Sequence, residues 1–404
     1  MKKRILFVMH YLELGGAETA LIGLLNAIDY SKFDVDLFLH SHRGEMLPFV
    51  PKEVNLLPEI PLYAQIERPM KAVLKDGYLG MVLARIAAKI RSNFYYIKHR
   101  NTDSSAGLQY IANAVTPMLP SINSRVEYDL AISFLCPHNI VRDKVRARQK
   151  ACWIHTDYST VDVNRVLELP VWDSYDKVIS ISPDVTRSFL LVFPSLKDKI
   201  VLMENILSPT FVRDRSNEFD PSEELYSFID NRANTTVLLS IGRFSHPKNF
   251  ERIPFICRKL IDNYKKSVVW FIIGYGEGEG LIRQNIQEAG MEKHVIILGK
   301  KTNPYPYIKA CDYYVQPSRY EGKSVTVREA QILYKPVVVT NYPTASSQIR
   351  DGIDGVIVPM DNDGCAEGIF SLMEDCLKQA SIVQYLQAHD YGNESAVNVL
   401  YGLV

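Results

Sequence analysis

The chain has 404 residues, of which 47% are hydrophobic, and its formal net charge at pH 7 is zero. A chain of this length and apolar content can form two ordinary domains, each with its own core. The balanced charge lacks the basic excess that is typical of nucleic-acid-binding proteins, so no nucleic-acid partner is expected.

The start of the chain and its cysteines favour a cytoplasmic protein. The apolar segment Ile5–Met9 is too short for the core of a signal peptide and is followed at once by polar residues, so we expect a first buried strand there. No segment approaches the roughly eighteen apolar residues of a membrane span. The cysteines are scattered without a Cys-x-x-Cys pair, which predicts reduced thiols and no zinc site. They are Cys136, Cys152, Cys257, Cys311, Cys365 and Cys376.

Short apolar segments alternate with helical patterns along the chain, which predicts an α/β fold with parallel sheets. In the first half, strands are expected at Ile5–Met9, Asp34–Leu39, Leu130–Phe134, Ala151–His155 and Lys177–Ile181. The first helix shows one apolar face, made of Leu21, Leu24, Leu25 and Ile28. In the second half, strands are expected at Val237–Ile241, Val268–Ile273, Val295–Leu298, Tyr313–Gln316, Pro336–Thr340 and Val356–Val358.

The segment Asn205–Asn234, which contains prolines and many charges, is expected to be a linker with a short surface helix. Two doubly wound domains joined by such a hinge would bind a ligand in the cleft between them, at the carboxyl ends of the strands.

In the first half, Gly15 and Gly16 stand between the first strand and the first helix, where glycine allows the backbone to approach a phosphate closely. A Gly-Gly turn is common, so this signal is weak by itself. His155 follows an apolar strand. A single histidine there is more often structural, but the carboxyl end of a strand is also where cleft residues lie. Asp157 beside it can contact an acceptor or cap a helix.

The region from Arg68 to Arg100 is basic, with Asp76 as its only acid. Six apolar residues at helical spacing form a stripe within it. They are Leu79, Leu83, Ile86, Ile90, Phe94 and Ile97. Two interpretations stay open. The region is either an ordinary helix packed on the domain with a basic outer face, or a surface that docks on anionic lipid. In both, we expect the stripe to pack on the fold.

In the second half, Arg243 and Lys248 follow a predicted strand and lie on either side of a turn, where two cations can hold a diphosphate. A solvated basic turn is the plain alternative. The glycine-rich segment Gly274–Gly280 departs from the Gly-x-Gly-x-x-Gly pattern at Glu279, so it is weak evidence for NAD and is expected to be a flexible turn.

Glu321 and Glu329 flank a tight loop that contains Gly322 and leads into a helix predicted to end at Tyr334. The backbone N–H groups and dipole of a helix N-terminus suit a phosphate, and the carboxylates suit hydroxyl groups such as those of a ribose and a sugar. The spacing alone is uninformative, since Glu45 and Glu53 share it. The strand, the Pro-Ser turn, the glycine and the helix start together indicate a nucleotide-sugar site.

The segment Tyr320–Ala330 resembles the Glu-x7-Glu motif of retaining GT-B glycosyltransferases of family 4, and Ala330–Thr340 continues the likeness. One departure is Lys323-Ser324, where many members carry Phe-Gly, and it bears on how the donor sugar fits. The resemblance implies two Rossmann-like domains facing a central cleft. An acceptor-binding domain would span 1–204 and a nucleotide-sugar-binding domain 205–382, with a C-terminal helix at about 383–404 crossing back to the first.

The resemblance also implies roles for individual residues. The catalytic residues would be His155 facing the donor sugar, Glu321 holding that sugar, and Arg243 with Lys248 clamping the diphosphate. Glu329 would hold the ribose. The nucleotide sugar would further contact Gly15, Gly16, Gly322, Lys323, Ser324 and Val325. No residue is a convincing covalent nucleophile, so the family suggests front-face attack assisted by the departing phosphate. No cofactor, and no metal held by an Asp-x-Asp motif, is expected.

The implied function is retaining transfer of a hexose-type sugar from a nucleotide-diphosphate sugar, UDP-linked, to a glycan or lipid-linked saccharide in cell-surface polysaccharide synthesis. Such an enzyme would be cytoplasmic and peripheral on the inner face of the membrane. Two alternatives remain, a nucleotide-sugar 2-epimerase of the same architecture and a non-catalytic nucleotide-sugar-binding partner.

Overall fold

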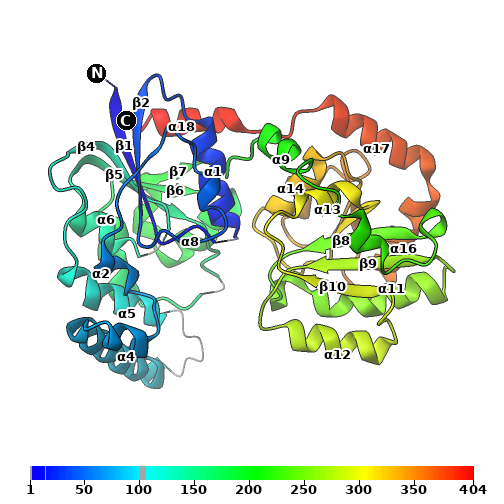
Figure 1. Ribbon diagram of the computed structural model, residues 1–404, viewed down its shortest axis with the longest axis horizontal. Helices are drawn as coiled ribbons and strands as arrows, with labels where there is room; N and C mark the ends of the chain where they lie inside the picture. Colours follow the sequence, from blue (N-terminus) through cyan, green and yellow to red (C-terminus); the bar gives the residue numbers. More distant parts are fainter. Residues whose placement is uncertain (1, 14, 100–105, 136, 160) are drawn as a thin grey trace. The chain divides into compact units, whose positions relative to one another are not determined.

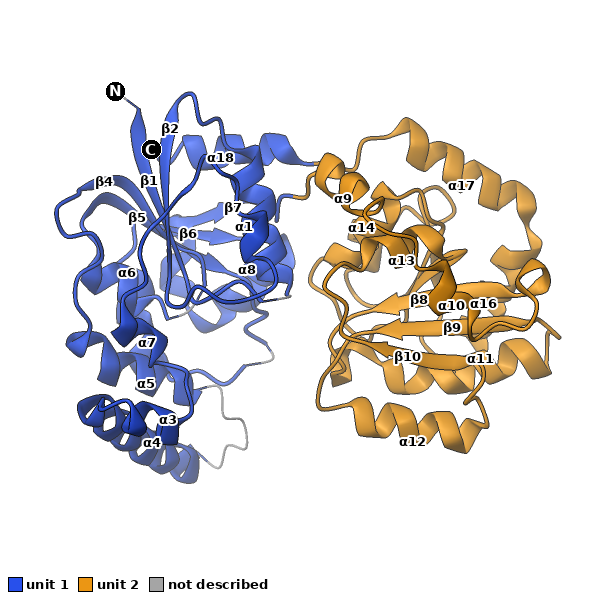
Figure 2. Ribbon diagram, in the orientation of Figure 1, with its two compact units in different colours: residues 1–206, 393–404 blue, residues 207–392 orange. Residues whose placement is uncertain are grey.

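The computed structural model describes residues 2–13, 15–99, 106–135, 137–159 and 161–404. They form two compact units, coloured by sequence in Figure 1 and by unit in Figure 2. Unit 1 holds residues 1–206 and 393–404, and unit 2 holds residues 207–392. None of the helices in the described ranges is long and apolar enough to cross a bilayer.

Unit 1 is built on a seven-stranded parallel sheet in the order β3-β2-β1-β4-β5-β6-β7. Its strands are β1 (Lys3–Met9), β2 (Phe33–Leu39), β3 (Asn55–Leu56), β4 (Tyr128–Ser133), β5 (Ala147–Ile154), β6 (Lys177–Ser180) and β7 (Ile200–Leu202). Its helices are α1 (Gly16–Ala27), α2 (Pro61–Ala64), α3 (Met70–Lys75), α4 (Leu79–His99), α5 (Ala106–Val115), α6 (Asn139–Lys144), α7 (Arg165–Asp173), α8 (Pro183–Val192) and α18 (Val397–Tyr401). The central strands are almost wholly buried, as expected for a parallel sheet covered on both faces.

Unit 2 is built on a six-stranded parallel sheet in the order β10-β9-β8-β11-β12-β13. Its strands are β8 (Thr236–Ile241), β9 (Val268–Ile273), β10 (Val295–Gly299), β11 (Tyr313–Gln316), β12 (Val337–Thr340) and β13 (Val356–Val358). Its helices are α9 (Pro209–Arg215), α10 (Ser222–Tyr226), α11 (Ile253–Asp262), α12 (Glu279–Ala289), α13 (Tyr305–Ala310), α14 (Val325–Ile332), α15 (Ala345–Gln348), α16 (Asn362–Glu374) and α17 (Cys376–Ala388).

In each sheet, successive strands are first added on one side of a central strand and then on its other side. This change of side determines which loops lie next to each other. In unit 2, β8 has β9 on one side and β11 on the other, so the chain moves away from β8 in opposite directions. A crevice forms outside the carboxyl ends of the strands at such a switch point, and ligands of doubly wound sheets bind there. The loops that follow β8 and β11 therefore lie beside each other in unit 2.

The predicted α/β architecture of two doubly wound domains is confirmed, and every expected strand is present. Two further strands, β3 and β7, form the edges of the first sheet and are only two and three residues long. The predicted apolar face of the first helix is buried as well. Four of the five described cysteines are buried. Cys136 lies outside the described residues.

Two expectations about particular segments were wrong in part. The segment expected to be a linker with a short surface helix does contain the unit boundary, after Ile206, and two short helices, α9 and α10. Its linker part is far shorter than expected, because α9 packs against α13 and α14 and the Arg215 carbonyl accepts a hydrogen bond from Asn303. The apolar stripe of α4 was expected to pack on the fold, but all six of its side chains are exposed. The helix instead packs on α3 and α5 through its opposite side.

The last segment of unit 1 is joined to its first helix and second strand. The ring of Tyr401 on α18 stacks on Phe33, with 4.6 Å between ring centroids. Its hydroxyl oxygen also accepts a hydrogen bond of 2.7 Å from the backbone N–H of Asp29. Residues 393–404 therefore complete unit 1, although residues 207–392 separate them in sequence from the rest of that unit.

Candidate functional site

The loop after β8 and the loop after β11 are joined by hydrogen bonds at the switch point of unit 2. The N–H of Arg319 donates to the Pro247 carbonyl at 2.8 Å, and its guanidinium donates to the His246 carbonyl at 2.7 Å. Asn249 adds a 2.9 Å bond from its amide to the Pro317 carbonyl and has a left-handed backbone with φ of 62°. These bonds fix the predicted Arg243–Lys248 turn against the predicted Glu321 loop.

Lys248 and Glu321 meet directly, at 2.6 Å between the ammonium nitrogen and a carboxylate oxygen. The same oxygen accepts hydrogen bonds from Ser318 at 2.6 Å and from Gln316 at 3.2 Å. The sequence had suggested separate partners for these two residues, a diphosphate for the lysine and a sugar for the glutamate. An ammonium group has three N–H donors, so a bond to Glu321 leaves two for another anion. The Lys248–Glu321 pair can therefore bind a diphosphate and a sugar that lie next to each other.

Arg243 lies in the same turn, and its side chain is exposed. The glycine-rich segment after β9 packs against this turn. Phe244 donates its N–H to the Tyr275 carbonyl at 2.8 Å and accepts from the N–H of Gly278 at 3.0 Å. A Cβ atom on Gly276 would stand 2.6 Å from the Phe244 carbonyl oxygen. The segment connects β9 to α12, as the expected turn should, and its contacts with Phe244 make it a close-packed support for the basic turn.

The helix that follows Glu321, α14, begins at Val325 with Ser324 as its N-cap residue. The side-chain amide of Gln348 bonds to both backbone groups of Ser324. Its Oε1 accepts from the Ser324 N–H at 3.0 Å, and its Nε2 donates to the Ser324 carbonyl at 2.6 Å. The Ser324 amide, predicted to face a phosphate, is therefore already bonded. The first amides of α14, beginning with Val325, have no carbonyl one turn earlier within the helix and stay suited to an anion.

Glu329 lies on α14 and is 4% exposed. Its carboxyl accepts a 2.9 Å hydrogen bond from the Tyr305 hydroxyl. Burial raises the pKa of Glu329 to about 7, although the bond from Tyr305 and the charge of Arg215 act in the opposite direction. Near neutral pH this carboxyl is therefore divided between its charged and neutral forms.

Glu321 and Glu329 lie near one buried ring, that of Tyr314 on β11. Burial, and then the charges of the two glutamates, raise the pKa of the Tyr314 hydroxyl well above its ordinary value. That hydroxyl donates a 2.7 Å hydrogen bond to Gln316. Sequence reasoning missed the supporting residues Tyr305, Tyr314 and Gln348. No local motif marks them, because each joins the site through a tertiary contact.

Gly15 and Gly16 lie in unit 1 at the start of α1, where Gly15 is the N-cap residue and Gly16 is the first residue of the helix. Glu18, one turn into the helix, extends back over Gly15, where a Cβ atom would stand 2.2 Å from the carboxylate oxygen of Glu18. The Glu18 side chain is 11% exposed, and its carboxylate oxygen lies 3.9 Å from Nε2 of His10. A carboxylate therefore lines the glycine turn that was expected to approach a phosphate, and its charge disfavours an anion there.

His155 directly follows β5. Its ring lies 4.6 Å from the ring of Phe134 and stacks parallel to Trp153 at 5.9 Å between centroids. Burial lowers the pKa of His155 to about 3, so the imidazole is neutral at physiological pH. Its Nε2 atom is buried and has no hydrogen-bond partner among the described residues.

Two more histidines directly follow strands of the same sheet, His10 after β1 and His40 after β2. Burial lowers the pKa of His10 to about 4 and that of His40 to about 3. Sequence reasoning missed both, although the repeated placement of a histidine after a buried strand was a visible signal. The carboxyl edge of the first sheet thus carries neutral imidazoles, which donate at one nitrogen and accept at the other.

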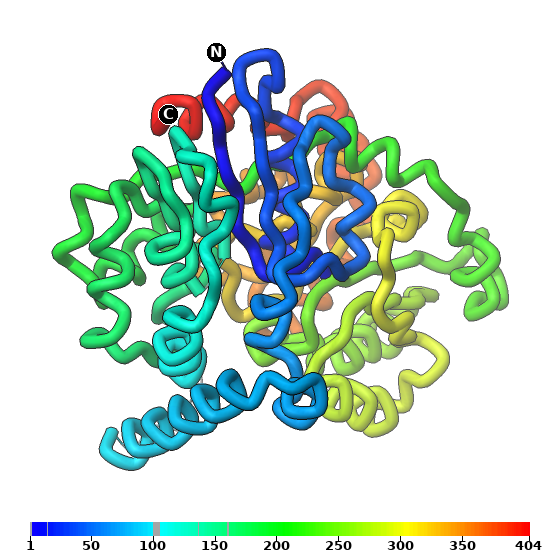
Figure 3. The backbone as a smooth tube through the Cα atoms, turned by 60° about the vertical axis from the view of Figure 1, so that its left-hand side comes forward, coloured from blue at the N-terminus to red at the C-terminus, as the bar shows by residue number. Residues whose placement is uncertain are grey.

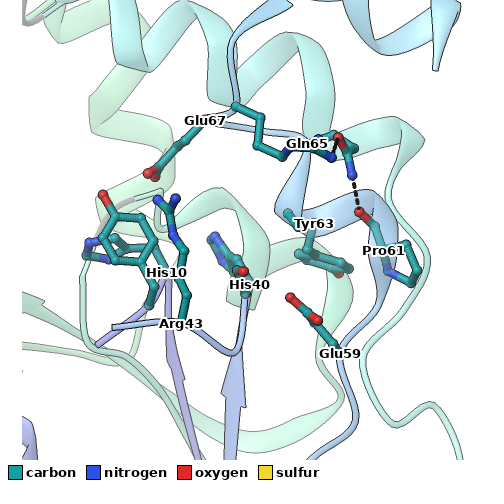
Figure 4. Close-up of a pocket in the computed structure, with 12 residues that line it drawn as sticks. His10, His40, Arg43, Glu59, Pro61, Tyr63, Gln65 and Glu67 are labelled. Atoms are coloured by element: carbon teal, nitrogen blue, oxygen red, sulfur yellow. Dashed lines mark hydrogen bonds between the residues drawn. The ribbon is translucent and has the colours of Figure 1, made fainter. Parts of the chain in front are cut away.

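A pocket of about 410 Å³ lies at this edge of unit 1 (Figure 4). Its polar and aromatic lining comes from His10, Tyr11, His40, Ser41, Arg43, Glu59, Tyr63, Gln65, Glu67 and Arg68. The guanidinium of Arg43 lies 4.1 Å from the centre of the Tyr11 ring, and Figure 4 shows it between His10 and His40. Cations, carboxylates, imidazoles and flat rings together suit a ligand that has many hydroxyl groups and apolar C–H faces.

Two Asp-x-Asp patterns occur in the chain, at Asp34/Asp36 and at Asp361/Asp363, and both have structural partners. Asp36 accepts hydrogen bonds from Asn55 and Tyr128, and Asp34 lies 3.7 Å from Lys2. Asp361 caps α16, and Asp363 is ion-paired with Lys259. Within the described ranges, no three His, Cys, Asp or Glu side chains are grouped so that they could hold a metal ion.

Residues 223–389, which form most of unit 2, match the family model of glycosyl transferases group 1. The Arg243–Lys248 turn, the Lys248–Glu321 pair and Glu329 all lie inside the matched residues. The family model therefore agrees with the sequence-based resemblance over residues 223–389.

Curated relatives that resemble the chain carry transferase names. A 4-α-N-acetylgalactosaminyltransferase of Campylobacter jejuni that acts on a diphospho-undecaprenol saccharide is 26% identical over 144 residues, which are 34% of this chain and 37% of the relative. An Escherichia coli α-1,3-galactosyltransferase named for UDP-Gal and GlcNAc-diphosphoundecaprenol is 26% identical over 133 residues, 32% of this chain and 34% of the relative. The chain thus spans only about a third of the length of these relatives.

Solved structures match the fold over nearly the whole chain. Anabaena Alr3699/HepE, in complex with UDP and glucose, has a TM-score of 0.66 at 16% identity, covering 99% of this chain and 98% of that one. Staphylococcus aureus TarM, in complex with UDP and other ligands, has a TM-score of 0.66 at 12% identity, covering 99% of both chains. At such low identity the likeness shows the fold, which is that of GT-B glycosyltransferases.

Proposed function

We propose that the protein is a retaining glycosyltransferase that moves a hexose-type sugar from a UDP-linked donor to a lipid-linked saccharide in cell-surface polysaccharide synthesis. The observation that carries this proposal is the Lys248–Glu321 pair at the switch point of unit 2, with exposed Arg243 in the same turn as Lys248. A cation bonded to a carboxylate suits a donor whose diphosphate and sugar must be bound side by side.

Each residue has a role in the proposed reaction. The acceptor hydroxyl oxygen bonds to the anomeric carbon of the sugar while the bond from that carbon to the diphosphate oxygen breaks. The acceptor proton passes to the departing diphosphate on the same face, which retains the anomeric configuration. Arg243, Lys248 and the first amides of α14 stabilise the charge that builds on the diphosphate. No metal takes part.

The sugar and the ribose are bound by the carboxylates. Glu321, held by Ser318 and Gln316, accepts hydrogen bonds from donor-sugar hydroxyls, and Glu329 accepts from the ribose hydroxyls. We assign His155 to the donor sugar as the resemblance implies, and burial keeps its imidazole neutral by lowering its pKa to about 3. These assignments rest on burial, bonding partners and the family match of unit 2.

The pocket of unit 1 is the proposed acceptor site. Its flat rings suit the C–H face of a saccharide, and its charged groups suit hydroxyls and a phosphate-bearing end. The two curated relatives named for diphospho-undecaprenol saccharides motivate the lipid-linked class of acceptor. A pocket dedicated to an acceptor also favours a transferase over a 2-epimerase, which needs none.

The proposal is tested by thermal shift with a panel of nucleotide sugars, followed by transfer assays. A ligand present at one hundred times its Kd stabilises the folded protein by about 2.7 kcal/mol, which gives a measurable rise in Tm. We expect a UDP-sugar to give the largest rise, and diphospho-lipid saccharides to release UDP and form an α-linked product by NMR. Sugar interconversion without an acceptor would establish the epimerase instead. Binding with no turnover on any acceptor would establish the binding partner.

A further inference from the structure

The helix α4 of unit 1 exposes an apolar surface that the fold does not use. The six side chains of its apolar stripe (Leu79, Leu83, Ile86, Ile90, Phe94 and Ile97) are between 41% and 76% exposed. They recur every three or four residues, so they lie along one side of a helix about 30 Å long. In Figure 3 the helix extends along the outside of unit 1 as a separate rod, in blue to cyan.

The side of α4 that faces the protein is different. Met81, Val82, Ala88 and Ser92 are buried there, and they supply the contact with α3 and α5. The helix thus has two apolar sides, and only one is needed for its packing. An exposed, contiguous apolar surface of this length marks an interaction site.

The charges of α4 identify the partner. The helix contains no acidic residue, and its exposed cations stand beside the stripe, Lys89 along one border and Arg91 and Lys98 along the other. An apolar face bordered by cations on both sides matches a helix that lies in the interface of a membrane with anionic headgroups. Two copies of α4 packed through the stripe would bring like charges together, which disfavours self-association.

We propose that α4 lies in the interface of an anionic lipid bilayer, with its apolar stripe in the headgroup–acyl boundary and Lys89, Arg91 and Lys98 on the headgroups. The apolar stripe enters the boundary because its side chains are free of the protein core. The cations add an attraction that falls with salt. Binding should therefore be strongest for anionic vesicles at low salt, weaker at high salt, and measurable but lowest for neutral vesicles.

The structure also links α4 to the pocket of unit 1. Arg85 turns inward and donates to the carbonyls of Gln65 at 3.0 Å and Arg68 at 2.6 Å, and both of these residues line the pocket. A helix seated on the membrane would thereby hold the rim of the pocket close to the bilayer. This consequence rests on the proposed function, since it gives a lipid-linked saccharide a short path into the pocket.

The test is co-sedimentation with vesicles of phosphatidylcholine alone or mixed with phosphatidylglycerol, at low and high salt. Phe94→Asp and Ile90→Asp place a charge in the stripe at exposed positions that the fold does not need. We expect each to lower partitioning into anionic vesicles at least tenfold. The control Leu377→Asp changes an exposed leucine on α17 of unit 2 and should leave partitioning unchanged. Lys89→Glu combined with Arg91→Glu should reduce both the binding and its dependence on salt.

Three results would overturn the proposal. The first is a parent protein that binds no anionic vesicle at low salt, and the second is Phe94→Asp binding as well as the parent. The third is a dimer by light scattering that Phe94→Asp abolishes, because the stripe would then be occupied by a second copy. As a positive sign independent of sedimentation, Phe94→Trp should show a blue-shifted emission with anionic vesicles that brominated lipid quenches.

The membrane proposal and the transferase proposal fail in distinguishable ways. If the α4 variants lose vesicle binding but transfer sugar to a short-chain, water-soluble acceptor at the parent's rate, both proposals stand. A parent that binds vesicles but transfers to no acceptor would refute only the transferase. Transfer to a vesicle-bound acceptor should fall with Phe94→Asp and not with Leu377→Asp.

Discussion

Glu321 and Glu329 are the same type of residue in two different environments. Glu321 is bonded by a cation and two neutral donors, whereas Glu329 has the hydroxyl of Tyr305 and the more distant charge of Arg215. Burial raises the pKa of Glu329 to about 7, because the bond from Tyr305 and the charge of Arg215 offset its desolvation only in part. The charge of Glu329 is therefore adjustable within the physiological range.

We expect UDP affinity to depend on pH through Glu329. Ribose hydroxyls donate more strongly to a carboxylate than to a carboxylic acid, so binding should favour the ionised form. With a pKa of about 7, the ionised fraction rises about tenfold between pH 6 and pH 8, and affinity measured by calorimetry should rise with it. Glu329→Gln should bind more weakly and show no such rise. A parent whose affinity is flat across this range would contradict the ribose role.

The same carboxyl should make stability depend on pH. Unfolded, it titrates at about 4.5, and folded, at about 7, so between these values the folded state holds more protons. The free energy of unfolding must therefore fall as the pH rises through this window, by about 2–4 kcal/mol in total. Glu329→Gln lacks this fall and should be more stable than the parent at pH 8. Urea unfolding of the parent and the variant at pH 5 and pH 8 measures these free energies. If the unfolding free energy changed equally with pH in the two proteins, the raised pKa would be contradicted.

Arg243→Ala and Lys248→Ala should each weaken UDP binding by roughly 1.5–3 kcal/mol, because each removes a charge-assisted hydrogen bond. Lys248→Ala also leaves Glu321 without its cation, so it should reduce turnover more than Arg243→Ala does. Lys259→Ala is the matched control, since that lysine pairs with Asp363 on the α11–α16 side of unit 2. If both site variants bind UDP as tightly as Lys259→Ala, the basic turn is not the diphosphate site.

At the scale of elements, the sequence predicted what depends on local pattern. Buried parallel strands are continuous apolar segments, so each longer strand was visible, whereas β3 and β7 are too short to leave a pattern. Helical periodicity revealed the apolar stripe of α4, because it shows which residues share one side of a helix. It did not reveal that the stripe is exposed, because it does not show what packs on that side. The bonds of Gln348 to Ser324 join residues 24 apart, beyond the range of any local motif.

The glycine-rich support of the basic turn can be tested with a matched pair of variants. Gly276→Ala would place a Cβ atom 2.6 Å from the Phe244 carbonyl, at a φ of +151° that side chains rarely adopt. We expect a loss of about 1–3 kcal/mol in unfolding free energy and weaker UDP binding, because Phe244 adjoins Arg243. Gly280→Ala lies in α12, where a Cβ meets no described atom within 4 Å. It should stabilise by about 0.5–1 kcal/mol. Equal effects of the two would refute close packing.

At the scale of the whole molecule, unit 1 depends on residues that follow unit 2 in sequence. Tyr401→Ala removes the ring stacked on Phe33 and the acceptor for the Asp29 amide. We expect a loss of about 2–4 kcal/mol in unfolding free energy, confined to unit 1. Hydrogen exchange resolved by peptide should show faster exchange in β1 and β2 and unchanged exchange in β8 and β9. Asn398→Ala, at an exposed position of α18, is the control. Faster exchange in both units would mean that the effect is not local.

Unit 2 lies in sequence between the two parts of unit 1, and this determines the order in which the ribosome completes the two units. Residues 207–392 are continuous, so unit 2 has all its strands and helices as soon as that stretch has left the ribosome. Unit 1 begins first but waits for residues 393–404 before α18 can seat Tyr401 on Phe33. Throughout that interval the nascent chain carries an incomplete first domain whose α4 already bears an apolar face. The part of the protein that starts earliest is therefore finished last, and it is the part most in need of protection while translation continues.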